Sequence, residues 1–137
     1  MLRTIGWGLS IVVVGLASPA LGARKSADEI VQLYARDLVA SLTRPVKELK
    51  GFARIHLSPG EARRVRLRLD LRQLAFLDHD LQWVVEPGDV EIAVGGSSED
   101  LPLRRTIRTL GEPTTVDPNS LRPTSVENTA VGVAPLG

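Results

Sequence analysis

The chain of 137 residues contains no cysteine. Disulfide bonds, thiolate catalysis, zinc–thiolate centres and lipid attachment through cysteine are therefore excluded, and stability has to come from a hydrophobic core. The chain also has no large excess of charge of one sign, because it contains seventeen basic and sixteen acidic residues. A nearly neutral chain has no overall field that attracts a polyanion, so we expect no nucleic-acid partner.

Residue combinations that could carry out chemistry are scarce as well. Asp78, His79 and Asp80 are potential metal ligands, but consecutive residues of an extended chain point to opposite sides. His56 alternates with apolar neighbours and has no nucleophile beside it in the sequence. The GGSS motif at 95–98 lacks the lysine and the helix of a phosphate-binding loop. We therefore expect no catalytic residue, no metal and no cofactor.

The first segment, residues 1–22, has the composition of a secretory leader. It combines one positive charge, an apolar run over 5–16 and small residues suited to cleavage at positions 18–22. We therefore expect export to the periplasm or the extracellular space. Two alternatives remain open for this segment: a retained membrane anchor, since 5–23 is uncharged and approaches the length of a bilayer span, or a strand of the following domain. The protein would have a membrane partner only if the leader stays uncleaved.

Apolar and polar residues alternate with a period of two through most of residues 23–110, which predicts short β-strands. The clearest case is ARRVRLRLDL (62–71), in which Val65, Leu67 and Leu69 are expected to face the core and the arginines to face water. The motifs SPGE (58–61) and EPG (86–88) predict turns. Expected strands lie near residues 30, 52, 62, 88 and 101, with a short helical turn within 72–81. The pattern predicts an all-β, immunoglobulin-like antiparallel β-sandwich.

Five strands are fewer than the roughly seven of such a sandwich. We therefore expect the sandwich to lack its first strand unless residues 11–16 supply it, and an open edge could accept a strand from a second chain. Residues 111–137 show no periodicity and contain four prolines. This composition predicts a disordered tail.

Two features permit a binding role. Arg64, Arg66 and Arg68 form a row on one face of the 62–71 strand, which suits an anion or a sugar acid, although solvated charges that prevent aggregation of a sheet are the commoner explanation. Trp83 could stack on a sugar ring, although a tryptophan beside two valines more commonly belongs to the core.

A family resemblance is carried by five blocks: VQLYARD (31–37), RPVKELKGF (44–52), LSPGE (57–61), LAFLD (74–78) and WVVEPGDVEIAVGGSSED (83–100). Over residues 22–110 the chain resembles the C-terminal fibronectin type III-like domain of glycoside hydrolase family 3 enzymes, the β-glucosidases and β-xylosidases. The resemblance implies a non-catalytic accessory module linked to β-glucoside and β-xyloside metabolism. The nucleophile and the acid/base residue of the family belong to other domains, so no catalytic residue is carried over.

The resemblance also implies a contact with a glycosidase catalytic domain. Our candidates for the contact surface are the polar residues of one loop: Arg44, Lys47, Glu48 and Lys50. One departure from the family is that the leader-like segment stands where a strand ending in Asn-Thr-Gly usually opens the domain. Three hypotheses remain: a structural or interaction module, a free-standing carbohydrate-binding module that uses Trp83, and a fragment of a family 3 glycosidase.

Overall fold

The computed structural model describes residues 2–5, 8–15, 26–39, 41 and 47–131. The elements in these ranges are β1 (Leu2–Ile5), β2 (Gly8–Gly15), β3 (Ala27–Asp37), β4 (Glu48–Leu57), β5 (Arg63–Asp70), the 3-10 helix η1 (Leu71–Leu74), β6 (Phe76–Leu77), β7 (Trp83–Val85), β8 (Gly88–Gly95), β9 (Leu103–Thr109), β10 (Thr114–Thr115), the 3-10 helix η2 (Pro118–Ser120) and β11 (Ser125–Ala130).

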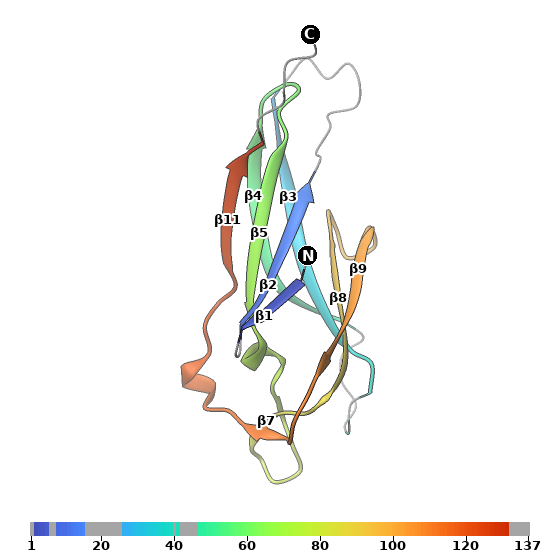
Figure 1. Cartoon of the computed structure of the whole chain (residues 1–137), viewed down its shortest axis with the longest axis vertical. Helices are drawn as coiled ribbons and strands as arrows, with labels where there is room; N and C mark the ends of the chain where they lie inside the picture. The colour runs from blue at the N-terminus through green and yellow to red at the C-terminus, as the bar shows by residue number, and fades with distance from the viewer. Residues whose placement is uncertain (1, 6–7, 16–25, 40, 42–46, 132–137) are drawn as a thin grey trace.

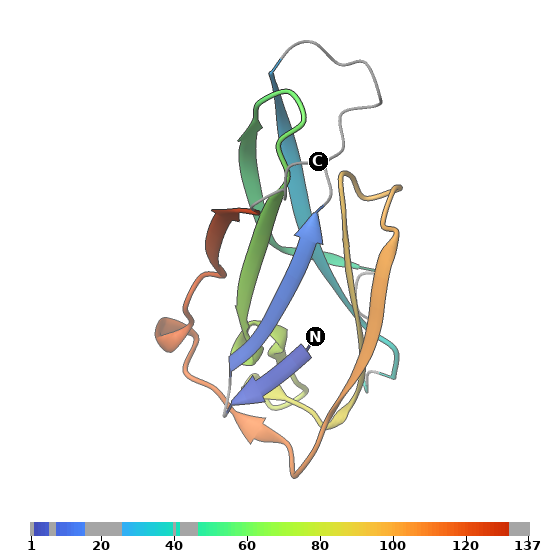
Figure 2. The same ribbon diagram turned by 45° about the horizontal axis from the view of Figure 1, so that its top comes forward.

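The strands form two four-stranded sheets and one small sheet. The strand orders are β1-β2-β5-β11, β4-β3-β8-β9 and β10-β7-β6, and the described pairs of strands are all antiparallel. Figures 1 and 2 show β5 and β2 on one side of the molecule and β3 and β4 behind them, with β7 at one end. The prediction of an all-β antiparallel sandwich is confirmed.

The core lies between the two larger sheets and follows the predicted alternation. Val65, Leu67 and Leu69 of β5 are at most 1% exposed, and Leu33 of β3 is fully buried opposite them. The arginines between these β5 residues lie on the other face of the strand, where they are exposed or half-buried. The predicted facing of this strand is therefore confirmed.

The predicted turn at 58–61 is present and is held by two hydrogen bonds. The Glu61 amide donates to the Ser58 carbonyl at 2.9 Å, and the Glu61 carboxylate accepts from the Ser58 amide at 2.8 Å. Gly60 has a φ of +75°, a conformation that glycine adopts without a steric penalty. The helical turn expected within 72–81 is η1, which begins earlier, and the Asp70 carboxylate caps it by accepting from the Arg72 amide.

The expected disordered tail needs correction over residues 111–131. In this range β10 pairs with β7, and β11 pairs with β5 over six residues, from Ser125↔Arg68 to Ala130↔Arg63. All six residues of β11 are exposed. Main-chain hydrogen bonds hold β11 to β5, and no side chain of β11 is buried. The sequence of such a strand need not alternate between apolar and polar residues, so alternation did not predict it.

β2 pairs with the edge of β5 that faces away from β11, over eight residues. Of the alternatives for residues 1–22, the structure therefore shows strands over 2–5 and 8–15. The expected cleavage positions at 18–22 lie outside the described residues. Within the part of the chain that the structure describes, no helix has the length and apolar character of a membrane span.

Candidate docking surface

Residues 48–52, the end of the family block RPVKELKGF (44–52), form the start of β4 and contain a β-bulge. Leu33 of β3 lies opposite Gly51, and Tyr34 lies opposite Leu49, so Lys50 is the extra residue. The Lys50 Nζ donates to the Glu48 carboxylate and to the Gln73 carbonyl, each at 2.7 Å, and its side chain is only 12% exposed. Lys50 therefore holds β4 to η1.

The candidate Lys47 lies at the surface just before the bulge. Its Nζ is 5.9 Å from the centre of the Tyr34 ring and donates a hydrogen bond to the Ser98 carbonyl. Lys47 thus links the start of β4 to the loop after β8. The candidate Arg44 lies outside the described residues.

Three large apolar side chains are exposed near one another on the outer face of β3 and β4: Ile30, Leu49 and Phe52, at 38%, 51% and 64%. Phe52 lies opposite Gln32 and Ile30 lies opposite Arg54, which makes Ile30 and Phe52 diagonal neighbours across the two strands. We refer to these three residues as the β3–β4 apolar patch. The sequence analysis did not predict this patch, because it considered only polar residues as candidates for a contact surface.

A charged group borders this patch. The Asp28 carboxylate accepts from Arg54 Nε at 2.9 Å and lies 2.7 Å from His56 Nδ1. The hydrogen bonds from His56 and Arg54 lower the pKa of Asp28 below its usual value. The His56 side chain is 66% exposed, as expected for a solvent-facing strand position, and it is paired with a carboxylate rather than a nucleophile. The arrangement is a surface hydrogen-bond network of Asp28, Arg54 and His56.

The segment Asp78-His79-Asp80 builds a turn. One oxygen of the Asp78 carboxylate accepts from the amides of Asp80 and Gln82, both at 2.9 Å, and Leu81 has a φ of 59°. Across the described ranges, no three histidine or acidic side chains come together as a metal site would require.

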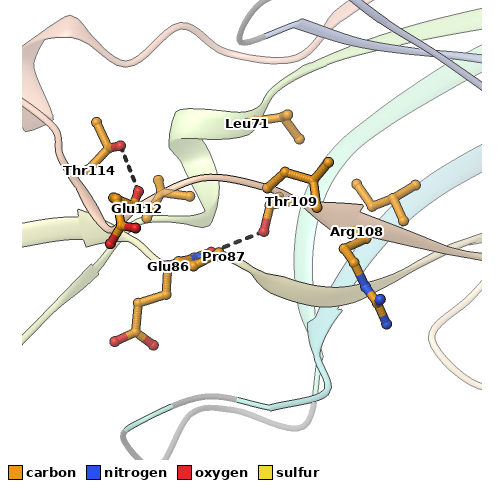
Figure 3. Close-up of a pocket in the computed structure, with 10 residues that line it drawn as sticks. Leu71, Glu86, Pro87, Arg108, Thr109, Glu112 and Thr114 are labelled. Atoms are coloured by element: carbon orange, nitrogen blue, oxygen red, sulfur yellow. Dashed lines mark hydrogen bonds between the residues drawn. The ribbon is translucent and has the colours of Figure 1, made fainter.

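A cavity of about 440 Å³ is lined by η1, by β7 with the turn after it, and by β9 with the segment that leads into β10 (Figure 3). Two hydroxyls of its lining bond to main-chain carbonyls: the Thr109 hydroxyl donates to the Glu86 carbonyl, and the Thr114 hydroxyl donates to the Glu112 carbonyl. The sequence did not predict this cavity, because its lining comes from four separate segments. The lining also contains the charged Glu86, Arg108 and Glu112, of which Arg108 is paired with Asp89.

Trp83 does not belong to the core. It is 39% exposed and lies opposite Leu77, which is 42% exposed, whereas the neighbouring Val84 and Val85 are buried. Part of the indole ring is therefore accessible, which the commoner interpretation of this residue did not predict.

Two packed four-stranded antiparallel sheets define an immunoglobulin-like β-sandwich domain. The fibronectin type III-like domain family matches residues 29–98. The chain belongs to this family.

The relatives of the chain are glycoside hydrolases. It is 40% identical over 100 residues to thermostable beta-glucosidase B of Acetivibrio thermocellus, a match that covers 72% of this chain and 13% of the relative. It is 50% identical over 74 residues to a beta-xylosidase of Formosa agariphila, with coverages of 54% and 10%. The resemblance to the fibronectin type III-like domain of these enzymes is confirmed.

Solved structures agree with the sequence matches. Beta-glucosidase from Kluyveromyces marxianus superposes with a TM-score of 0.75 at 29% identity, covering 84% of this chain and 14% of that protein. Beta-glucosidase 3B from Thermotoga neapolitana gives a TM-score of 0.70 at 28% identity, with coverages of 86% and 16%. The chain thus spans less than a fifth of each of these relatives, and its match is to their small fibronectin type III-like part.

Proposed function

We propose that this protein is a non-catalytic accessory module that packs against a glycosidase catalytic domain through the β3–β4 apolar patch. The observation that carries the proposal is the exposure of Ile30, Leu49 and Phe52 near one another, inside the segment 29–98 that defines the family. Adjacent exposed apolar side chains with a polar rim are typical of protein–protein contacts. Complete burial of a fully exposed side chain of this size contributes about 1.5–3 kcal/mol, and docking would bury the exposed part of each of the three.

The polar candidates take different places in this proposal. Lys47 lies at the border of the patch, near the Tyr34 ring, and the Asp28 group lies on its other side. Glu48 lies opposite the buried Ala35, on the core-facing side of β4, and pairs with Lys50. Arg44 lies outside the described residues and remains a candidate from the sequence alone. Lys50 supports the surface from within, because its ammonium group is held by Glu48 and Gln73.

Export belongs to the same proposal. It is supported by the leader-like composition of residues 1–22 and by a relative named periplasmic beta-glucosidase, from Salmonella typhimurium, which is 39% identical over 77 residues. Removal of residues 1–22 would also leave one side of β5 without the partner it has in β2. An unpaired strand edge accepts a strand from another chain, so a second chain is the proposed partner of a cleaved form.

A binding experiment tests the docking proposal. The full chain is titrated into the Acetivibrio thermocellus beta-glucosidase B from which the roughly 100 matching residues have been removed. We expect a complex in size-exclusion chromatography, a higher melting temperature of the enzyme and a gain of activity on an aryl β-glucoside. The chain alone is expected to hydrolyse neither aryl β-glucosides nor aryl β-xylosides.

The control variants locate the contact. Phe52→Asp should weaken the complex by about tenfold or more, because it places a charge in an apolar interface. Leu110→Asp should leave it intact, since Leu110 is 84% exposed and lies outside the patch. Equal losses in the two variants would contradict docking through the patch. Turnover by the chain alone, after host glycosidases have been removed, would contradict the non-catalytic role.

A second candidate function is binding of neutral β-linked oligosaccharides at Trp83, favoured by the partial exposure of its ring. Aromatic rings present an apolar face that suits stacking on a sugar. If this candidate holds, cellohexaose and xylohexaose should change the intrinsic fluorescence, and Trp83→Ala should abolish the change. A titration with no change in fluorescence or in heat would remove this candidate and leave the accessory module.

A further inference from the structure

The outer face of β5 carries three arginines with too few carboxylates around them. Arg64, Arg66 and Arg68 are spaced two residues apart, which is about 7 Å along a strand. Glu127 of β11 is shared between two of them, at 3.7 Å from Arg66 Nη1 and 3.7 Å from Arg68 Nη2. Among the described residues, no carboxylate lies within ion-pair distance of Arg64. We call these three residues the arginine row.

The outer face of the other sheet shows a different arrangement. There Arg54 bonds to Asp28 at 2.9 Å, Arg104 to Glu91 at 3.2 Å, and Arg108 to Asp89 at 2.6 Å. Each of these arginines therefore has a carboxylate of its own at hydrogen-bond distance. The arginine row lacks such pairing, although the chain as a whole is close to neutral.

Protection of a sheet edge does not explain the arginine row. Charged side chains prevent aggregation when they lie on an edge strand with unpaired main-chain groups. β5 is not an edge, because β2 pairs with it on one side and β11 on the other (Figure 1). In the full chain, the like charges therefore repel one another on the face of a central strand that has no open edge.

We propose that the arginine row binds an acidic polysaccharide, a linear chain of sugars whose carboxylate groups lie in sequence along it. A guanidinium group binds a carboxylate through two parallel hydrogen bonds, and a straight row of three suits a linear ligand. The exposed hydroxyls of Ser125 and Thr129 lie opposite Arg68 and Arg64 on β11, where they can bond to sugar hydroxyls. This site lies on the sheet opposite the β3–β4 apolar patch, so it stands independently of docking.

Other polyanions fit this face less well. Single-stranded nucleic acids need aromatic side chains on which their bases stack, and neither β5 nor β11 contains an aromatic residue. Anionic membranes bind clusters of four or more basic residues, usually together with inserted apolar groups. The row has only three basic residues; opposite it lie the polar Ser125, Glu127 and Thr129 on β11 and Ser10, Val12 and Val14 on β2.

The proposal is tested by affinity electrophoresis of the full chain in gels that contain polygalacturonate, with dextran as the neutral polymer. We expect retardation by polygalacturonate alone, which weakens as salt screens the charges. The variant R64Q/R66Q/R68Q should lose about tenfold or more in affinity. The matched control R54Q/R104Q/R108Q removes the same charge from the other sheet and should retain binding. Thermal melting checks that both variants are folded.

A conservative variant keeps the test decisive if the glutamine variant does not fold. R64K/R66K/R68K retains the charge and loses the two-pronged geometry, so it should bind more weakly than the unchanged chain. The proposal is overturned if polygalacturonate does not retard the unchanged chain, if the folded lysine variant binds as tightly as the unchanged chain, or if the two glutamine variants lose affinity equally. Tighter binding to phosphatidylserine vesicles or to single-stranded DNA than to polygalacturonate would also overturn it.

Discussion

Leu67→Asp is expected to unfold the domain, whereas Arg64→Asp is expected to leave it folded. Leu67 is fully buried in the middle of β5, between the buried Val65 and Leu69. The substitution removes a burial contribution of about 1.5–3 kcal/mol and places in the core a carboxylate whose desolvation costs several more. Small domains are stable by only about 5–15 kcal/mol in total, so the loss takes most of the margin.

The matched control Arg64→Asp changes a residue of the same strand on its exposed face. Circular dichroism melts and urea titrations of the two variants measure the difference. We expect Leu67→Asp to show no cooperative transition near the temperature of the unchanged protein, and Arg64→Asp to melt within a few degrees of it. Equal destabilisation would mean that β5 is shifted by one residue, because such a slip exchanges the faces of the strand.

Gly95→Ala is expected to destabilise the protein strongly. A Cβ atom at position 95 would lie 1.9 Å from the Asp100 carbonyl oxygen and 2.8 Å from the Leu101 Cα. The loop cannot easily move away, because the Ser97 hydroxyl accepts from the Asp100 amide at 3.1 Å and Leu101 is buried. Overpacking of this kind costs about 1–3 kcal/mol or more, and the obstacle here is main chain rather than a flexible side chain.

Gly96→Ala is the control for this effect, since the nearest atom to a Cβ at position 96 is 3.9 Å away. Urea unfolding of the two variants gives the comparison as a difference in the free energy of unfolding. The Gly96 variant should lie within about 1 kcal/mol of the unchanged protein. A Gly95 variant as stable as the Gly96 variant would show that the loop over residues 96–100 does not lie against β8.

Several features of the fold could be predicted from the sequence because they leave a local signal. The strands that bury one face, above all β5, alternate in polarity along the chain, and this alternation also predicts which residues face the core. The turn at 58–61 depends on a proline and on a glycine with positive φ, which are local requirements. The family blocks, in turn, predicted a fibronectin type III-like domain, and residues 29–98 match that family.

The candidate site was predicted less completely. Sequence reasoning selected polar residues of one loop as a contact surface, and in the structure Lys50 among them makes its contacts inside the protein. The β3–β4 apolar patch arises only when β3 and β4 pair with a bulge, which places Phe52 diagonal to Ile30 and puts Leu49 on the same face as Phe52. Which exposed side chains are neighbours depends on strand register, and register is not visible in either strand alone.

The sequence by itself determined the all-β class, the facing of β5 and the shortage of catalytic groups, because each follows from the type and order of neighbouring residues. The tertiary structure alone decided that β2 and β11 flank β5, that β11 is a strand although it buries no side chain, and that the arginine row lacks counter-charges. The physical reason is that strands are paired by main-chain hydrogen bonds, which every residue except proline can both donate and accept. The partner of a strand therefore depends on which segments the folded chain brings together, and β5 and β11 lie more than fifty residues apart in the sequence.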